Sequence, residues 1–315
     1  MATLLVARWK SRRIARRLSA LAVVVVACVA GGANARAQDP PASAGPVTLT
    51  PRVELRHDLR LDVPITVGLA AGVVTWTLVK NDVVARECRW CDGSAPGEVN
   101  AVDDFFRTAL RRPDIEPAKA ISNVLSYGVG PALTIGLGVL AASADRRLDE
   151  TPLNLLLVAE GALAALTVSE ALKPIVLRER PDYHALDAEA KKAVAPSAEP
   201  LLSFPSGHPM AVFAVTSAMG TIASMRGYRL APLVWIAGSM VGIATGYARI
   251  AADRHYFTDV LAGTTIGFVV GGGVPWLFHQ PRTTATSELG RILQRTRLAT
   301  TEVRGGRIVT LGASF

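Results

Sequence analysis

Six long apolar segments limit what this chain can fold into. Each has 17 to 24 residues, enough for a helix to cross about 30 Å of hydrocarbon. They are 63–79, 121–144, 153–172, 209–225, 230–248 and 260–278, and only 153–172 carries charge, at Glu160 and Glu170. They are rich in small residues, as closely packed membrane helices are. We therefore expect an all-α fold, a bundle of six membrane helices; a soluble bundle with unusually buried helices is the alternative.

The first 37 residues have the layout of an export signal. Basic residues between Arg8 and Arg17 precede an apolar stretch over 18–29, and Ala35-Arg36-Ala37 fits an A-x-A cleavage site. An uncleaved anchor and lipoprotein processing at Cys28 are the alternatives. The expected organisation is a signal peptide over 1–37, a linker over 38–60, a helical domain over 61–280 and a polar tail over 281–315, in which a small hairpin is possible.

The net charge of +8 does not indicate a nucleic-acid-binding protein. Residues 1–37 contribute seven positive charges and no acidic residue, and the tail adds more positive charge. Without these two ends the chain is slightly acidic. No broad basic face remains to follow a phosphate backbone, so we expect no nucleic-acid partner.

The connections between the apolar segments alternate in length. Those after the second and fourth segments are short, at 145–152 and 226–229, whereas those after the first and third are long, at 80–120 and 173–208. Helices joined in series place alternate connections on opposite sides of a bundle. Because long ordered loops are usually functional, we expect the active site on the long-loop side.

Three polar clusters fall on that side: Lys173 to Arg180-Pro181, then Pro205-Ser206-Gly207-His208, then Arg249 to His255 and Asp259. Taken singly, a lysine at a helix end can snorkel to the interface, and a serine before a helix can be only a cap. However, backbone N–H groups at a helix start also bind anions. A carboxylate four residues after a histidine can orient the imidazole for attack.

Together the clusters resemble the three-part signature of the type 2 phosphatidic acid phosphatase superfamily, also called the PAP2/vanadium haloperoxidase superfamily. That signature is K-x6-RP, then PSGH, then S-R-x5-H-x3-D. Here 23 residues separate Pro181 from Pro205, and 39 separate His208 from Ala248. Ala248 stands where the family usually has Ser, which removes one hydroxyl that would hydrogen-bond to phosphate.

The resemblance implies a role for each matching residue. Lys173, Arg180 and Arg249 would bind the phosphate oxygens and stabilise the charge of the transition state. Ser206 and the Gly207 N–H would add hydrogen bonds.

The histidines would carry the chemistry. His255 would attack phosphorus and form a phosphohistidine, with Asp259 orienting it. His208 would protonate the leaving oxygen and then activate water. Members of the family work without Mg²⁺, and no Asp/Glu cluster in the sequence suggests a two-metal clamp, so we expect no metal and no cofactor.

The resemblance implies a phosphatase that acts on a lipid phosphate or an isoprenyl diphosphate at a membrane. The alternatives are an exported acid phosphatase for small phosphomonoesters, a vanadium-dependent haloperoxidase, and a non-enzymatic scaffold that retains the motif. The sequence does not indicate an oligomeric state.

Cys88 and Cys91 form a lone C-x-x-C. Zinc would need two further ligands, and a thioredoxin-like site would need a βαβ unit, so a structural disulfide is the better interpretation. Such a bond suits an oxidising compartment.

Arginines on the short-loop side place that side in the cytoplasm and the active site outside; they are Arg52, Arg56, Arg60, Arg146, Arg147, Arg226, Arg229 and Arg282. A cleaved signal followed by six spans would give the opposite orientation. We expect a bacterial inner-membrane protein with a periplasm-facing site, and a periplasmic protein is the alternative.

Overall fold

The computed structural model describes residues 52–282, apart from 86, 94 and 195–196, together with two strands near the C-terminus. The expected signal peptide over 1–37, most of the expected linker over 38–60 and part of the tail lie outside the described residues.

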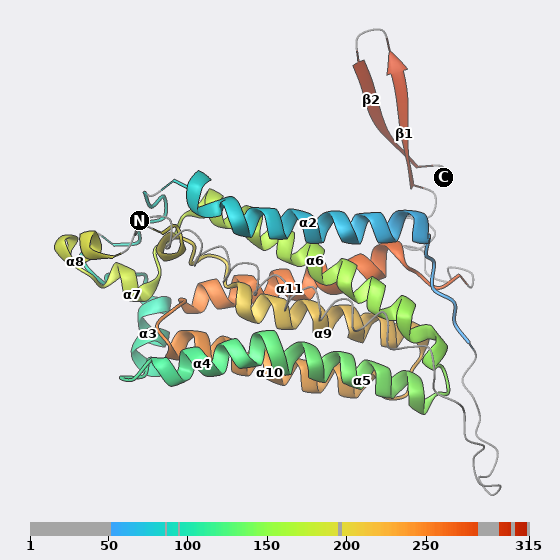
Figure 1. Ribbon diagram of the computed structural model, residues 1–315, viewed down its shortest axis with the longest axis horizontal. Helices are drawn as coiled ribbons and strands as arrows, with labels where there is room; N and C mark the ends of the chain where they lie inside the picture. The colour runs from blue at the N-terminus through green and yellow to red at the C-terminus, as the bar shows by residue number, and fades with distance from the viewer. Residues whose placement is uncertain are drawn as a thin grey trace, which may run out of the picture. The chain divides into compact units, whose positions relative to one another are not determined.

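All six apolar segments form helices, which run side by side (Figure 1). They are α2 (Leu59–Val83), α4 (Glu116–Val124), which continues through a π-helical turn (Leu125–Val129) into α5 (Gly130–Ala144), α6 (Thr151–Val176), α9 (Gly207–Arg226), α10 (Ala231–Ala251) and α11 (Phe257–Phe278). The connections contain the shorter helices α3 (Ala101–Leu110), α7 (Pro181–His184) and α8 (Ala188–Ala193), with single 3-10 turns at Leu148–Glu150 and Glu199–Leu201.

Five of these helical stretches are long and apolar enough to cross a membrane: α2, α4 with α5, α6 with its preceding turn, α10 and α11. The bundle is therefore that of a membrane protein. Of the six helices expected to span, five therefore have the length and apolar character of a membrane span, and α9 is the exception. Most of its residues are buried, and it packs against α5, α6, α10 and α11, so it forms the centre of the bundle. A central helix meets protein on every side and needs less apolar surface than helices that face lipid.

Small residues let α11 approach α9 closely. Gly263, Gly267 and Gly271 lie four residues apart on one face of α11. A Cβ at Gly263 would come within 2.2 Å of the Ser206 carbonyl oxygen, and one at Gly267 within 2.3 Å of the Met210 carbonyl oxygen. Neither position has room for a side chain. The glycine contact sets the start of α9 against the start of α11, where the second and third motifs lie.

The long connections share one end of the bundle, as expected. There the Arg89 N–H donates to the Leu177 carbonyl at 3.1 Å, and the Asp182 N–H donates to the Asp253 carbonyl at 3.1 Å. The short connections pair at the opposite end, where Arg229 forms an ion pair with Asp145.

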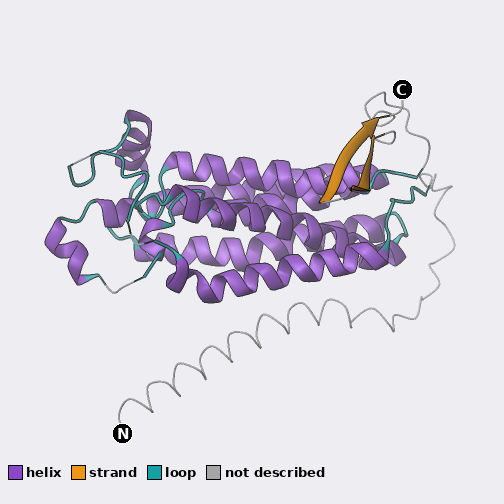
Figure 2. Ribbon diagram, turned by 90° about the horizontal axis from the view of Figure 1, so that it is seen from above, coloured by secondary structure: helices purple, strands orange, loops and turns teal. Residues whose placement is uncertain are grey.

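The predicted hairpin is also formed. β1 (Thr296–Val303) pairs with β2 (Gly306–Ala313) in antiparallel register (Figure 2). The all-α prediction therefore holds for the bundle, and the tail contains the hairpin that the sequence had allowed.

Candidate active site

The three motifs meet at the end of the bundle that carries the long connections. Lys173 lies near the end of α6, Arg180 precedes α7, Ser206 precedes α9, Arg249 lies in the last turn of α10, and His255 lies between α10 and α11. The Ser206 N–H donates to the backbone carbonyl of Asp259 at 3.0 Å. Lys173 Nζ lies 3.4 Å from the position that a Cβ on Gly207 would occupy. The fold thus assembles residues that are up to 86 positions apart in the sequence.

Two contacts decide which nitrogen of the buried His255 carries the proton. Nε2 lies 3.0 Å from Arg180 Nη1, a group that can only donate, so Nε2 accepts. Nδ1 lies 2.8 Å from the backbone carbonyl of Ser203, which can only accept, so Nδ1 carries hydrogen and donates. The neutral ring therefore presents the lone pair of Nε2 toward the cations of the site. This is the tautomer that a nucleophilic histidine requires.

The surroundings also keep His255 neutral. Burial is the main cause that lowers the pKa of His255 well below its ordinary value, and the positive charges of Arg180 and Arg249 lower it further. Nε2 is thus unprotonated, with a free lone pair, at neutral pH.

Asp259 has different partners from those that the motif pattern predicts. Oδ1 accepts from Arg178 Nη1 at 2.7 Å, and Oδ2 accepts from Ser203 Oγ at 2.6 Å and from the Tyr256 N–H at 2.9 Å. The distance from Oδ2 to His255 Nδ1 is 3.8 Å, too long for a hydrogen bond. His255 and Asp259 do not share a helix face, because α11 begins after His255 with Tyr256 as its N-cap. Asp259 therefore acts on His255 as a nearby charge and through Ser203, which contacts both.

Three cations lie near the His255 imidazole. Arg180 is buried and is held by Glu199, through its backbone carbonyl at 2.8 Å and its carboxylate at 3.2 Å. Arg249 donates from Nη1 to Ser122 Oγ at 3.2 Å, whereas its buried Nε has no partner among the described residues. Lys173 pairs with Glu170 inside the protein and does not reach outward to the interface.

Ser206 does not act as a helix cap. Its side chain makes no capping hydrogen bond to α9, and its buried Oγ has no partner within the described part of the chain. A fully buried hydroxyl without a partner is costly unless a ligand completes it. The first N–H groups of α9, from Gly207 onward, lie at the same place. Together with Arg249 Nε they form a set of donors suited to the oxygens of a phosphate group.

His208 follows Gly207 directly, in the first turn of α9. Its Nε2 lies 2.9 Å from Asn123 Oδ1, and its ring packs against Tyr127 with centroids 5.0 Å apart. Burial is the main cause that lowers the pKa of His208 in the free protein to about 2, and the positive charges of Arg249, Arg180 and Lys173 contribute to this shift. Asn123, Tyr127 and Ser122 all come from the helix before the motifs, and no spacing in the sequence pointed to them. These residues reach the site because α4 packs against α10, a contact that only the tertiary structure creates.

Arg178 is a further residue that the motif pattern did not single out, although it lies inside the first motif. Its fully buried guanidinium binds three carboxylates: Asp92 at 2.9 and 3.0 Å, Asp103 at 2.7 Å and Asp259 at 2.7 Å. It also lies between the rings of Trp90 and Tyr256, 4.3 and 4.2 Å from their centroids. Arg178 thus connects the loop of residues 84–100 to the carboxylate beside His255. Asp92 and Asp103 are two of several acidic residues in the long first connection, and no spacing in the sequence distinguished them as partners of Arg178.

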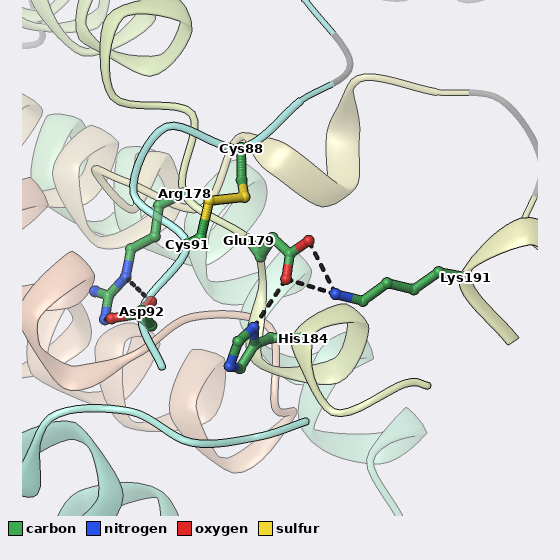
Figure 3. The surroundings of a disulfide bond; sticks show 7 residues. All are labelled: Cys88, Cys91, Asp92, Arg178, Glu179, His184 and Lys191. Atoms are coloured by element: carbon green, nitrogen blue, oxygen red, sulfur yellow. Dashed lines mark hydrogen bonds and ion pairs between the residues drawn. A yellow bond between two sulfur atoms is a disulfide. The ribbon is translucent and has the colours of Figure 1, made fainter. Parts of the chain in front are cut away.

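The predicted disulfide is present beside this network (Figure 3). Cys88 and Cys91 are bonded, and the next residue, Asp92, reaches Arg178. The neighbouring Glu179 points the other way and binds His184 and Lys191. Both ring nitrogens of His184 thus have partners: Nδ1 contacts the Glu179 carboxylate, and Nε2 lies 3.0 Å from the Glu98 carbonyl. His184 is not grouped with Lys173, Arg180 and Arg249.

Comparisons with known proteins agree with this geometry. Residues 154–283 match the sequence model of the PAP2 superfamily. The chain is 27% identical to decaprenylphosphoryl-5-phosphoribose phosphatase of Mycobacterium tuberculosis over 176 residues, which are 56% of this chain and 87% of that protein. It is 35% identical to lipid A 1-phosphatase of Porphyromonas gingivalis over 75 residues, 24% of this chain and 16% of that protein.

Among solved structures, a transmembrane PAP2-type phosphatidylglycerolphosphate phosphatase from Bacillus subtilis is 20% identical, with a TM-score of 0.39, covering 68% of this chain and 94% of that one. The matched segment 154–283 contains all three motifs and every residue that they predicted for the site. The similarity to the PAP2 superfamily therefore covers the part of the chain that carries the site.

Proposed function

We propose that this chain, a membrane phosphatase of the PAP2 superfamily, removes phosphate from an isoprenyl phosphate or another lipid phosphate through a phosphohistidine intermediate. The single observation that carries the proposal is the state of His255. Its Nδ1–H is bound to the Ser203 carbonyl, and its Nε2 lone pair faces Arg180. A neutral imidazole that is oriented in this way among fixed cations is suited to attack phosphorus.

In the first step, Nε2 of His255 forms a bond to phosphorus, and the bond between phosphorus and the leaving lipid oxygen breaks. Arg180, Arg249 and Lys173 balance the charge that spreads over the phosphoryl oxygens. His208 donates a proton to the leaving oxygen. The negative charge of the phosphate group offsets the three cations and thereby favours the protonated form of His208 in the complex.

In the second step, water attacks the phosphohistidine. His208, now neutral, accepts a proton from the water, and the bond between phosphorus and Nε2 breaks. Inorganic phosphate leaves, and His255 recovers its lone pair. None of these steps uses a metal ion.

The surface beside His208 supports a lipid substrate. Tyr127 packs on the His208 ring and yet is 70% exposed, and Val124 and Ile243, on the neighbouring helices α4 and α10, are also exposed. Large apolar side chains that face outward from membrane-type helices contact lipid tails. A lipid could thus bring its phosphate to the site from the side. The name of the relative from Mycobacterium tuberculosis makes polyprenyl phosphates the first class to test.

The test is phosphate release by the full chain, purified in detergent and assayed in EDTA. The substrates are decaprenylphosphoryl-5-phosphoribose, undecaprenyl diphosphate, phosphatidic acid and the small ester p-nitrophenyl phosphate. We expect release from at least one lipid, a loss of at least about 10⁴-fold in His255→Ala, and no change in the matched control His57→Gln at the other end of the bundle. Acid-quenched wild-type protein should carry labelled phosphate on histidine.

Two results would contradict the proposal: release that needs added Mg²⁺, or release that persists in His255→Ala. Hydrolysis of p-nitrophenyl phosphate alone would favour the exported acid phosphatase, and bromide oxidation with added vanadate would favour the haloperoxidase.

We further propose that the site faces the periplasm across a bacterial inner membrane. The disulfide at Cys88 and Cys91 lies at the site's end of the bundle and supports an oxidising compartment there. Arg146 and Arg229 at the other end support a cytoplasmic location for the short connections. In intact spheroplasts, a membrane-impermeant maleimide should label Lys192→Cys and not Asp149→Cys. The reverse pattern would place the site in the cytoplasm.

A further inference from the structure

A second cluster of ionisable side chains lies at the opposite end of the bundle from His255. Asp62 comes from the first turn of α2, Glu160 from α6, and His279 directly follows α11. All three are more than nine-tenths buried. One ligand atom from each lies within 4.8 Å of the others. A backbone hydrogen bond also joins the segments before α2 and after α11, because the Arg56 N–H donates to the Gln280 carbonyl at 3.0 Å.

The imidazole of His279 is oriented with one nitrogen free. Its Nδ1 lies 3.0 Å from the backbone carbonyl of Arg56, so Nδ1 carries hydrogen and donates. Nε2 points toward Glu160 Oε2 at 3.4 Å, without the geometry of a hydrogen bond. Both atoms are buried polar atoms that have no hydrogen-bond partner among the described residues. A histidine whose Nδ1–H is held by a backbone carbonyl and whose Nε2 is free has the arrangement that is usual for metal ligands.

The charges of the cluster do not balance. Asp62 and Glu160 contribute two carboxylates, and the one ion pair that the described residues give them is that of Glu160 with His279, so even a protonated His279 would leave one negative charge uncompensated. Other buried acids of the bundle do have one: Asp253 binds Arg107, and Glu150 lies 3.4 Å from Arg226. Buried charges that are not paired are costly, and the usual remedies are a change of protonation or a metal ion. A single divalent cation would neutralise both carboxylates.

The spacing fits one ion. Two ligands bound to the same tetrahedral zinc at about 2.1 Å lie about 3.4 Å apart. This equals the separation of His279 Nε2 from Glu160 Oε2. Asp62 is held at Oδ2 by the Asp58 N–H at 2.9 Å, which leaves Oδ1 available. The Asp62 carboxylate is the third ligand group, within 4.8 Å of the other two.

We propose that Asp62, Glu160 and His279 bind a divalent transition-metal ion, with Zn²⁺ the ion that suits this ligand set best. One imidazole and two carboxylates fit zinc, whereas Mg²⁺ takes oxygen ligands and keeps its water. A cavity of about 590 Å³, lined in part by the same three residues, offers room for a water molecule as the fourth ligand. The ion would fasten α2, α6 and α11 to one another. This site takes no part in the chemistry at His255.

The experiment measures zinc binding by the full chain in detergent. The protein is stripped with EDTA, incubated with Zn²⁺ or Mg²⁺, desalted, and analysed for metal content. We expect about one Zn²⁺ per chain and no retained Mg²⁺. Glu160→Gln and His279→Gln should each bind Zn²⁺ at least about tenfold more weakly. The matched control is His57→Gln, which removes a histidine from the lining of the same cavity and should bind as the wild type does.

Zinc should also raise the melting temperature of the wild type and leave that of His279→Gln unchanged. Should the variants fail to fold, X-ray absorption at the zinc edge of the wild type decides: a shell of nitrogen and oxygen supports the site, and a shell with sulfur overturns it. Retention of well under one Zn²⁺ per chain, or equal binding by both variants and the wild type, would also overturn it. Because the readouts are metal content and melting temperature, their failure leaves the phosphatase proposal unaffected, and the loss of phosphate release does not bear on the metal site.

Discussion

Replacement of Arg178 by glutamine tests the network beneath the active site. Arg178 is fully buried and is the common partner of Asp92, Asp103 and Asp259. Glutamine keeps an amide donor but removes the charge and the fork of the guanidinium, so it cannot serve three carboxylates at once. The substitution leaves three acids close together in the interior with no cation between them.

The size of the effect follows from that geometry. Removing one partner of a buried ion pair costs about 3–5 kcal/mol, because the other charge stays buried without compensation. For a domain of this size each kcal/mol lowers the melting temperature by about 2–4 °C. We therefore expect Arg178→Gln to melt about 6–20 °C below the wild type.

The assay is thermal unfolding of the full chain in detergent, followed by circular dichroism. The matched control is Arg89→Gln, since Arg89 is an exposed arginine of the same region whose hydrogen bond, to the Ile175 carbonyl, is 3.3 Å long; we expect a change within about 0.5 kcal/mol. Adding Asp92→Asn to Arg178→Gln should cost less than the sum of the single effects, because the two groups interact directly. A melting temperature for Arg178→Gln within 2 °C of the wild type, on about the scale of the control, would refute the reasoning.

Three further outcomes are expected. Ala248→Ser should raise the kcat of phosphate release by about tenfold, because it restores a hydroxyl beside the bound phosphate; an unchanged kcat would mean that the hydroxyl does not reach the substrate. Burial and the charge of Arg180 hold the pKa of His255 well below 6.5, so the acid limb of kcat/KM should lie below that pH and move upward in Arg180→Gln; a limb that stays in place would argue against this electrostatic coupling. Burial alone would raise the pKa of Asp103, but hydrogen bonds, above all from Arg178, hold it below its ordinary value. Asp103 therefore contributes stability at pH values above its unfolded pKa, and this contribution is lost as the pH falls through its folded pKa. Melting temperatures measured between pH 6 and pH 3 should accordingly fall less in Asp103→Asn than in the wild type; equal slopes would exclude this role.

The sequence alone predicted the helices well and singled out motif residues that the fold brings to one end of the bundle, because both depend on local information. Twenty or so uncharged residues form a helix whatever they pack against, since backbone groups in an apolar setting must hydrogen-bond within their own segment. The alternation of short and long connections then predicted which end of the bundle carries the site. The motif residues were predictable for a related reason: each side chain stands at a helix end, and its spacing from the next is a property of the chain.

Contacts between distant residues could not be predicted in this way. The pattern assigned Asp259 to His255 as a direct partner, whereas Ser203, which no motif contains, holds Nδ1. Arg178 was an unassigned residue of the first motif until the fold brought Asp92 and Asp103 to it.

The same holds for the second cluster. Asp62, Glu160 and His279 are separated by about one hundred residues each, so no spacing links them. A side chain's partner depends on which helices pack together and in what register. Next to Glu160 the relevant contact is that of α6 with α11 at Gly161, where a Cβ would come within 2.5 Å of the Gly271 carbonyl oxygen. Composition and periodicity determine that helices form and which are apolar; only the packed bundle determines which buried charges meet.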